Sequence, residues 1–159
     1  AAAIAEIFLD NFDKKITPEM REDAKKTGLT FDEVITLASI VEREGISDED
    51  RPIIAGILFN RLKADWPLQV DGSICYAKEP STCYPLSSLD FKINSPYNTY
   101  MNRGLPPTPI GNPGLQAIKA ATSPKNSNYW FYISDPKTSK TIFAKTLEEH
   151  ALNKTKYLR

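Results

Sequence analysis

Apolar residues recur every three or four positions at the start of the chain, which is the spacing of one face of an α-helix. The residues on this face are Ile4, Ile7, Phe8 and Phe12. Lys14-Lys15 suits the C-terminus of that helix, because the helix dipole favours cations there. Thr17-Pro18 is typical of the start of a second helix, with Thr17 as N-cap. Gly28 is typical of the end of that helix. Two helices are therefore predicted within residues 1–28.

Two longer helices are predicted next. Thr30-Phe31-Asp32-Glu33 matches a capping box, in which Thr30 caps the helix and Glu33 bonds back to the cap. We expect this helix to end at Gly45 and to bury an apolar face made of Val34, Leu37, Ala38 and Val41. A fourth helix is expected after a cap at Ser47 or Asp48, and its apolar residues are Ile53, Ile54, Ile57, Leu58 and Leu62.

Residues 66–113 differ, because they are rich in Pro, Gly, Asn, Ser and Tyr and show no long period. Their aromatic content argues against disorder, so we predict ordered binding loops with short helical pieces. Regular structure returns as a short helix through Ala121, a hairpin with strands near 129–134 and 141–143, and a helix over 146–157. The predicted class is α+β: a mainly helical single domain over 1–159, with N-terminal helices in 1–28 and a core in 30–159.

Composition narrows the function. The chain has 159 residues, 41% apolar and 25% charged, which is typical of a soluble globular protein. Twenty basic and twenty acidic residues give no net charge, so a nucleic-acid partner is disfavoured. No apolar stretch approaches the roughly 20 residues of a membrane span. The spacing of Cys75 and Cys83 permits either a disulfide or two free thiols, and a single histidine cannot complete a Cys/His zinc site. No metal or cofactor is expected.

Glu44 is a candidate for acid/base chemistry. Helical spacing places it at the border of the buried face and in the last turn of its helix. Partial burial and the negative end of the helix dipole both disfavour a charge there, so both raise the pKa of the carboxyl. A carboxyl that stays protonated near neutral pH can act as a general acid. The spacing alone favours a simpler alternative, in which Glu42 and Glu44 form solvated pairs with Arg43 or Arg51.

The loops supply candidate binding residues. Amides and tyrosines among rigid prolines suit a hydroxyl-rich ligand, because rings cover sugar faces and amides bond to hydroxyls. From composition alone, a structural loop packed by its own aromatics is the more frequent case. Asn60, late in the fourth helix, fits either a buried residue that holds a loop or a partly exposed one. His150 is expected to be structural or at the surface. The candidate binding residues are Asn60, Gln69, Asp71, Tyr97, Asn98, Thr99, Tyr100, Pro106, Pro107 and Asn112.

Several motifs follow one another in a fixed order between about Thr36 and about Tyr157. They are residues 37–44, Arg51-Pro52, 59–62, 67–71, 95–100, 104–107, 112–114, the Tyr132-Ile133 strand and the segment from Phe143 to His150. In this order they resemble the motifs of the endolytic murein transglycosylases, the YceG-like family.

The resemblance implies a lyase that cleaves the MurNAc–GlcNAc bond inside glycan strands and leaves a 1,6-anhydro end. It assigns the catalytic acid/base to Glu44, the second glutamate of a Glu-x-Glu pair. Asp71 or Glu42 could stabilise positive charge in the transition state. The resemblance also implies peptidoglycan as partner, cell-wall synthesis or division proteins as further partners, and a place on the outer face of the bacterial cytoplasmic membrane. Membrane contact would come only through an N-terminal anchor that these residues do not include. Gly72 departs from the family, which usually has proline there.

Two alternatives remain open at this point. A hydrolytic muramidase on the same scaffold would use water in place of the sugar hydroxyl. A glycan-binding module without turnover would need the loops but not the proton chemistry of Glu44.

Overall fold

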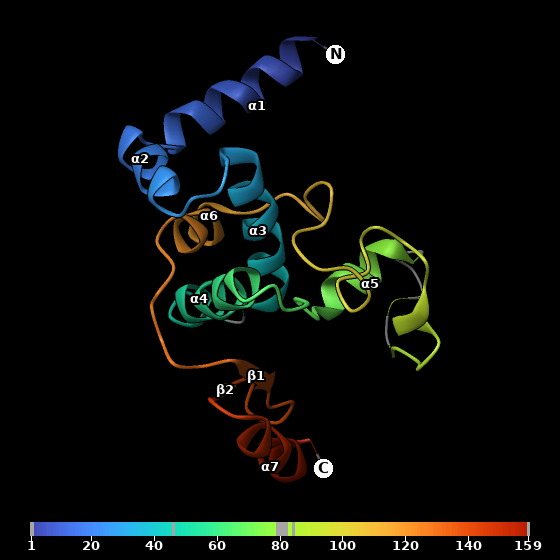
Figure 1. Ribbon diagram of the computed structural model, residues 1–159. Helices are drawn as coiled ribbons and strands as arrows, with labels where there is room; N and C mark the ends of the chain where they lie inside the picture. The colour runs from blue at the N-terminus through green and yellow to red at the C-terminus, as the bar shows by residue number, and fades with distance from the viewer. Residues whose placement is uncertain (1, 46, 79–82, 84, 159) are drawn as a thin grey trace.

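Local signals in the sequence set the limits of the first helices. The structure is a computed structural model that describes residues 2–45, 47–78, 83 and 85–158 (Figure 1). Helix α1 covers Ala2–Lys15, and α2 covers Pro18–Lys26 with Thr17 as its N-cap, as predicted. Gly28 follows with a φ of 80°, a left-handed conformation that glycine adopts without strain and that turns the chain towards the next helix.

Helix α3, Phe31–Glu44, begins with the predicted capping box and has Gly45 as its C-cap. Helix α4 covers Asp50–Lys63. The prediction of a cap at Ser47 or Asp48 was wrong by one or two residues, because Glu49 is the N-cap and makes no side-chain capping bond. Ser47 Oγ instead accepts a hydrogen bond from the Asp50 N–H at 3.1 Å, which stabilises the turn before the helix.

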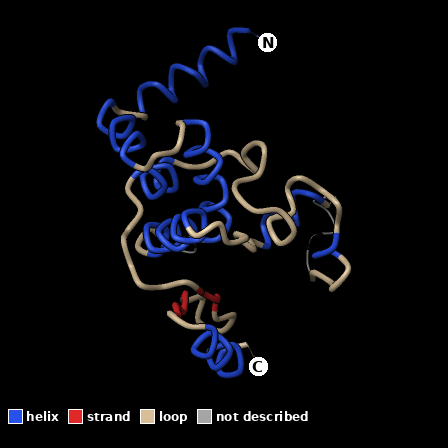
Figure 2. The backbone as a smooth tube through the Cα atoms, in the orientation of Figure 1, coloured by secondary structure: helices blue, strands red, loops and turns tan. Residues whose placement is uncertain are grey.

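The core lies where α3, α4 and α6 (Leu115–Thr122) pack together, with α2 against α6 (Figure 2). The apolar faces predicted for α3 and α4 meet there. The largest fully buried side chains of these two helices are Val34, Leu37, Ile40, Val41, Ile54, Ile57 and Leu58. Burial of such residues is the main stabilising contribution, at roughly 1.5–3 kcal/mol for each side chain.

Helix α1 does not bury the apolar face that its pattern predicts. It projects away from the packed helices (Figure 1), and Ile7 and Phe8 are 66% and 69% exposed. Only Phe12, in its last turn, packs against the core, with its ring edge-on to Phe31 at 6.2 Å. A helical period predicts a helix, but burial also needs a partner at the right place.

The middle of the chain is ordered by short elements and by polar side chains, in line with the prediction. It holds helix α5, Asp71–Ala77, and a 3-10 helix, Asp90–Lys92. Asn98 is fully buried and bonds three times to the main chain: its Nδ2 donates to the carbonyls of Phe91 and Ile93, and its Oδ1 accepts from the N–H of Tyr100. Cys75 in α5 is paired with Cys83 in a disulfide.

The C-terminal part is a small sheet covered by one helix. Strands β1 (Phe131–Ser134) and β2 (Thr141–Ala144) are antiparallel, and Tyr132 is opposite Phe143. Helix α7, Leu147–Tyr157, packs on both strands (Figure 1). The fold is α+β and mainly helical, as predicted. None of the helices in the described residues is long and apolar enough to cross a membrane.

Candidate active site

The carboxyl of Glu44 lies at the end of α3 and is held from two sides. Its Oε2 accepts a hydrogen bond from the Tyr132 hydroxyl of β1 at 3.0 Å. Its Oε1 accepts a longer bond from the Gly72 N–H in α5, at 3.4 Å. These partners come from segments 88 and 28 residues away, so the fold, rather than the local sequence, orients this side chain.

Burial raises the pKa of the Glu44 carboxyl above its ordinary value, because the charged form loses contact with water. The Tyr132 and Gly72 hydrogen bonds and the positive charge of Arg61 act in the opposite direction, while the negative charge of Asp71 adds to the rise. The net effect of these groups is a raised pKa. More of the carboxyl is therefore protonated near neutral pH than for an exposed glutamate, as a general acid requires.

The alternative from the sequence, that Glu42 and Glu44 both form solvated ion pairs with arginines, agrees with the structure for Glu42 but not for Glu44. Glu42 forms an ion pair with Arg51 at 3.6 Å and accepts a hydrogen bond from the N–H of Gly114, the N-cap of α6, at 3.1 Å. Glu44 points instead into the polar cluster with Tyr132 and Gly72. Two carboxyls two positions apart thus have different surroundings: Glu42 is ion-paired, whereas Glu44 is buried and bonded to Tyr132 and Gly72.

Asp71 and Tyr100 form a second polar pair beside Glu44. The Tyr100 hydroxyl donates to Asp71 Oδ1 at 2.5 Å, and the Tyr100 ring lies edge-on to Phe91. Burial, together with Asp71, raises the pKa of the Tyr100 hydroxyl, so it remains a donor. The pair keeps a carboxylate near Glu44 without a bond between the two carboxyls.

Gly72 allows the close approach of α5 to the end of α3. A Cβ at this position would lie 3.2 Å from the Cβ of Arg43 and 3.5 Å from Glu44 Oε1. A side chain here would require Arg43 to shift by a few tenths of an ångström, while its contact with Glu44 would be an ordinary one. A proline at this position would lack the N–H that bonds to Glu44 Oε1.

The segment before α5 is tied to the turn that carries Thr99. The N–H of Gln69 donates to the Thr99 carbonyl and the N–H of Val70 to Thr99 Oγ1, both at 3.1 Å. Ser73 Oγ lies 2.8 Å from Thr99 Oγ1. Gln69 adopts a φ of 53°, and its side chain is exposed, two residues before Asp71 in sequence. Thr99 is thus an interior anchor, whereas the Gln69 side chain lies at the surface.

Other predicted binding residues lie farther from the carboxyl or inside the fold. Asn60 donates to the carbonyl of Ser127 at 3.2 Å and is half-buried, so it holds the loop between α6 and β1 while remaining partly exposed, which combines the two expected cases. Asn98 and Pro106 are buried. The Tyr97 hydroxyl bonds to Thr108, and its ring packs on Tyr76. The structure does not bring these residues together with Glu44.

Asn112 is exposed in a loop that two residues of α3 hold in place. Ser39 Oγ accepts from the N–H of Ile110 at 3.0 Å, and Glu42 accepts from Gly114. Between these anchors, a Cβ on Gly111 would lie 3.8 Å from Arg43 Nε. The loop therefore passes beside the last turns of the helix that ends in Glu44.

Sequence reasoning did not select Tyr132 or Arg61 as site residues, although both lie in segments of the family resemblance. Arg61 is 5% exposed and shares the buried face of α4 with Ile54 and Leu58, one turn apart. An arginine on an apolar helical face was the available signal. His150 stacks on Phe131, and burial lowers its pKa, in keeping with a structural role.

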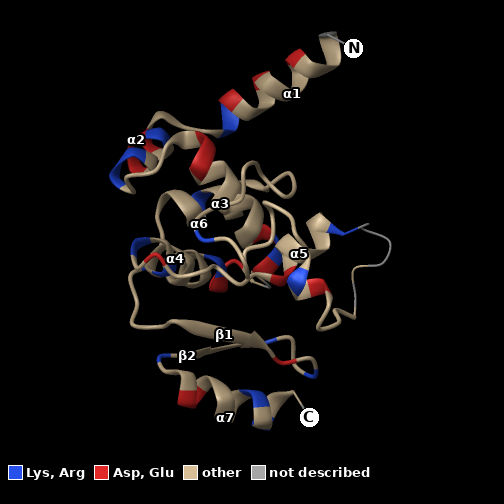
Figure 3. Cartoon of the chain, turned by 45° about the vertical axis from the view of Figure 1, so that its right-hand side comes forward, with Lys and Arg blue, Asp and Glu red and all other residues tan. Residues whose placement is uncertain are grey.

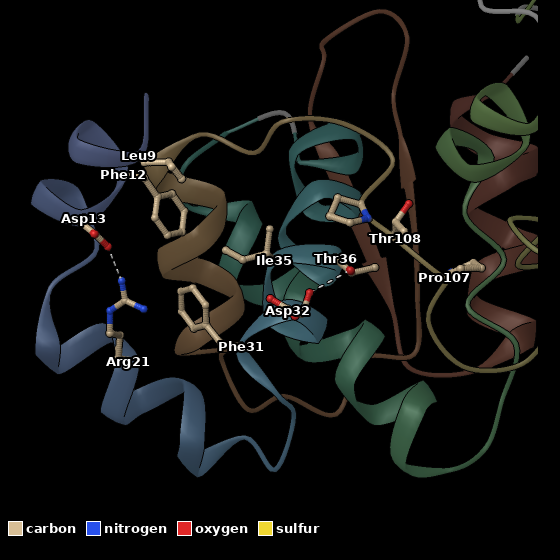
Figure 4. A pocket seen from close by; sticks show the side chains of 11 residues that line it. Leu9, Phe12, Asp13, Arg21, Phe31, Asp32, Ile35, Thr36, Pro107 and Thr108 are labelled. Atoms are coloured by element: carbon tan, nitrogen blue, oxygen red, sulfur yellow. Dashed lines mark hydrogen bonds and ion pairs between the residues drawn. The ribbon is translucent and has the colours of Figure 1, made fainter. Parts of the chain in front are cut away.

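A pocket of about 580 Å³ lies elsewhere, between the N-terminal helices and the loop at Pro107 (Figure 4). Figure 4 shows Phe12, Phe31 and Ile35 turned towards it. Glu44 does not line this pocket. In the described residues no cluster of three or more metal-ligand side chains occurs, and charges of both signs are interspersed along the helices (Figure 3).

Comparison with known proteins agrees with the resemblance. The model of the YceG-like family matches residues 1–156. A protein of Streptococcus pneumoniae serotype 2 (strain D39 / NCTC 7466), named endolytic murein transglycosylase, is 36% identical over 150 residues, which is 92% of this chain and 27% of that protein. A Bacillus subtilis (strain 168) protein of the same name is 37% identical over 87% of this chain and 38% of its own length.

A crystal structure of a YceG-like protein from Listeria monocytogenes matches with a TM-score of 0.76 and 38% identity, over 84% of this chain and 43% of that one. The chain thus spans less than half the length of each of these relatives.

Proposed function

The chain belongs to the YceG-like family, and from this membership we propose that it is the catalytic part of an endolytic murein transglycosylase with Glu44 as its acid/base. The observation that carries the proposal is the state of the Glu44 carboxyl. It is desolvated, held by Tyr132 and Gly72, and has a raised pKa. These are the properties of a group that gives and retakes a proton.

The proposed reaction needs one proton-transfer group. Protonated Glu44 gives its proton to the glycosidic oxygen as the bond from that oxygen to C1 of MurNAc breaks. The C6 hydroxyl of the same sugar attacks C1, and its proton passes to the Glu44 carboxylate. The products are a free GlcNAc 4-hydroxyl and a 1,6-anhydro end, no water is consumed, and Glu44 is protonated again.

Asp71 has a separate proposed role. Positive charge develops on the sugar ring in the transition state, as in other cleavages of glycosidic bonds. The Asp71 carboxylate, fixed by Tyr100, is near enough to Glu44 to raise its pKa. It would stabilise that positive charge, while the exposed side chains of Gln69 and Asn112 would bind sugar hydroxyls or amides. The remaining candidate residues would support the site from within the fold or extend it; they are Asn60, Tyr97, Asn98, Thr99, Pro106 and Pro107.

The cellular setting follows from the substrate. Murein lies outside the cytoplasmic membrane, so we place the whole protein on that side, with peptidoglycan strands as its partner. Cell-wall synthesis or division proteins would be further partners, and an N-terminal anchor would provide membrane contact. The paired Cys75 and Cys83 support this location, since disulfides persist in oxidising compartments. Residues 1–159 would act as one catalytic domain.

The test is digestion of purified murein followed by mass analysis of the products. The wild-type chain is expected to release anhydro ends, which are one water lighter than reducing ends. Glu44→Gln should lower turnover by roughly a hundredfold or more, the usual contribution of general acid catalysis. Glu42→Gln is the matched control, two residues away and bonded to Arg51 and Gly114, and should retain activity within about twofold.

Each alternative gives a different result. Reducing ends in place of anhydro ends would indicate a hydrolytic muramidase. Binding of strands without release of products, equal in wild type and Glu44→Gln, would indicate a glycan-binding module. Unchanged turnover in Glu44→Gln would refute the role of this carboxyl.

A further inference from the structure

Arg61 is a buried charged side chain that the proposed reaction does not use. It lies on α4, is 5% exposed, and its guanidinium lies 5.6 Å from the ring centres of both Trp66 and Phe131. Its hydrogen-bond acceptors are main-chain carbonyls rather than carboxylates. Nε and Nη2 donate to the carbonyl of Trp130 at 3.1 and 2.7 Å, and Nη1 donates to that of Leu68 at 2.5 Å.

These two carbonyls belong to the two segments that hold the acid/base. Trp130 is two residues before Tyr132, whose hydroxyl bonds to Glu44 Oε2. Leu68 is four residues before Gly72, whose N–H bonds to Glu44 Oε1. One guanidinium therefore ties together the backbone segments on both sides of the carboxyl. Its planar fork of donors can serve both carbonyls at once, whereas a lysine ammonium cannot reproduce that geometry.

The charge of Arg61 also acts on the same group. It lowers the pKa of the Glu44 carboxyl, against the effect of burial. The other groups that face Glu44 are Tyr132 from β1, Asp71 from α5 and Tyr100 from the loop. Of these groups only Arg61 carries a positive charge. His150 of α7, which stacks on Phe131, also feels the charge of Arg61; burial lowers its pKa, so it adds little charge near neutral pH.

We propose that Arg61 is a positioning residue for the acid/base. Its fork sets the distance between the Tyr132 hydroxyl and the Gly72 N–H, and its fixed charge favours the carboxylate that Glu44 becomes after it gives up its proton. The inference rests on the proposed function, since it needs Glu44 to be the acid/base. Because Arg61 is buried, it acts through other groups and does not touch the glycan.

The experiment compares Arg61→Lys, which keeps the charge but loses the fork, with Arg61→Met, which loses both. On soluble murein strands, Arg61→Lys should lower kcat by roughly ten- to a hundredfold and leave KM almost unchanged, because misplacement of a catalytic group affects the reaction and not the binding.

The basic limb of the kcat/KM profile of Arg61→Lys should stay at the wild-type pH. In Arg61→Met this limb should move to higher pH, since loss of the positive charge raises the pKa of Glu44 further. Arg21→Lys on α2 is the matched control and should behave as wild type.

A double-mutant cycle separates this role from general loss of structure. If Arg61 acts through Tyr132, Arg61→Lys in a Tyr132→Phe background should cost much less activity than in wild type. Thermal melts of each variant identify loss of folding, and the Lys variant suffices for the cycle should the Met variant fail to fold.

Independent effects of the two substitutions, or a basic limb in folded Arg61→Met that matches Arg61→Lys, would overturn the proposal. Activity in Glu44→Gln would instead refute the proposed function itself, so the two failures are distinguishable.

Discussion

The end of α3 and the N-terminal helix α1 differ in the side chains that they bury: polar ones are buried at the end of α3, and apolar ones are exposed on α1. At the end of α3, the polar side chains of Glu44, Tyr132 and Arg61 are buried or half-buried, and each has a hydrogen-bond partner from a distant segment. In α1, the apolar side chains of Ile7 and Phe8 are mostly exposed. Burial of a polar group is costly unless it is bonded, so the first region needs a specific arrangement that the second does not.

The pocket and the candidate acid/base lie in different parts of the molecule. The pocket of about 580 Å³ is lined by the N-terminal helices and the first turns of α3, including Phe12 and Phe31, and Glu44 does not line it. The raised pKa of Glu44 is found where α3, α5 and β1 meet. Substitutions in the N-terminal region should therefore change stability, and substitutions around the end of α3 should change the proposed activity.

Apart from substitution of Glu44 itself, the largest effect on turnover in this comparison is expected from Asp71→Asn. The variant should lower turnover on murein by at least roughly tenfold, because it removes a charge that stabilises the transition state. Asp71 raises the pKa of Glu44, so loss of its charge lowers that pKa. The basic limb of kcat/KM, which requires protonated Glu44, should then move to lower pH. Steady-state rates across a pH series measure both effects.

Asp65→Asn is the control for this substitution, since Asp65 is an exposed carboxylate that pairs with Arg103 at the surface. It should leave both the rate and the pH profile as in wild type. A basic limb that moves to higher pH in Asp71→Asn would show that the charge of Asp71 does not act on Glu44 as described.

Loss of the Cys75–Cys83 bridge should come next. It closes a loop of 8 residues in sequence separation, and its removal should lower the free energy of unfolding by about 2–3 kcal/mol. Chemical denaturation of Cys75→Ser/Cys83→Ser, compared with wild type with and without reductant, measures the change. Equal stability of wild type in both conditions would mean that the bridge does not form.

The smallest effects are expected in the N-terminal region. Phe12→Ala removes a half-buried ring that packs on Phe31, and should lower stability by about 1–2 kcal/mol without a change in turnover. Phe8→Ala, one turn earlier, should change stability by less than about 0.5 kcal/mol because its ring is exposed. Thermal unfolding of the two variants checks the difference. A large loss in Phe8→Ala would show that the exposed face is buried in solution.

Most of the fold follows from signals that are local in the sequence. The cap at Thr17, the capping box at Thr30 and the stop at Gly45 set the limits of α2 and α3, because each satisfies main-chain groups within a few residues. The hairpin was predicted from aromatic and β-branched residues and agrees with β1 and β2. The exposed face of α1 was not predicted, since its burial depends on a distant partner.

The candidate site was predicted only in part, for the same reason. Glu44 could be placed at the end of a helix and at the border of its buried face. Its two hydrogen-bond partners are 28 and 88 residues away, and spacing cannot reveal such contacts. Asn98 and Thr99 were selected as binding residues by their polarity, but both are buried and bond within the fold. Polarity in a loop does not distinguish a ligand contact from a structural bond.

The most direct measurement of the central claim is a titration of Glu44 itself. Carbon-13 NMR of the side-chain carboxyl carbons across a pH series, with Glu44→Gln used to assign the resonance, reports the pKa of this group. We expect a midpoint above the ordinary value of an exposed glutamate, because burial disfavours the charged form. A midpoint at or below that ordinary value would contradict the account, because the carboxyl would then be ionised before it could give its proton to a sugar oxygen.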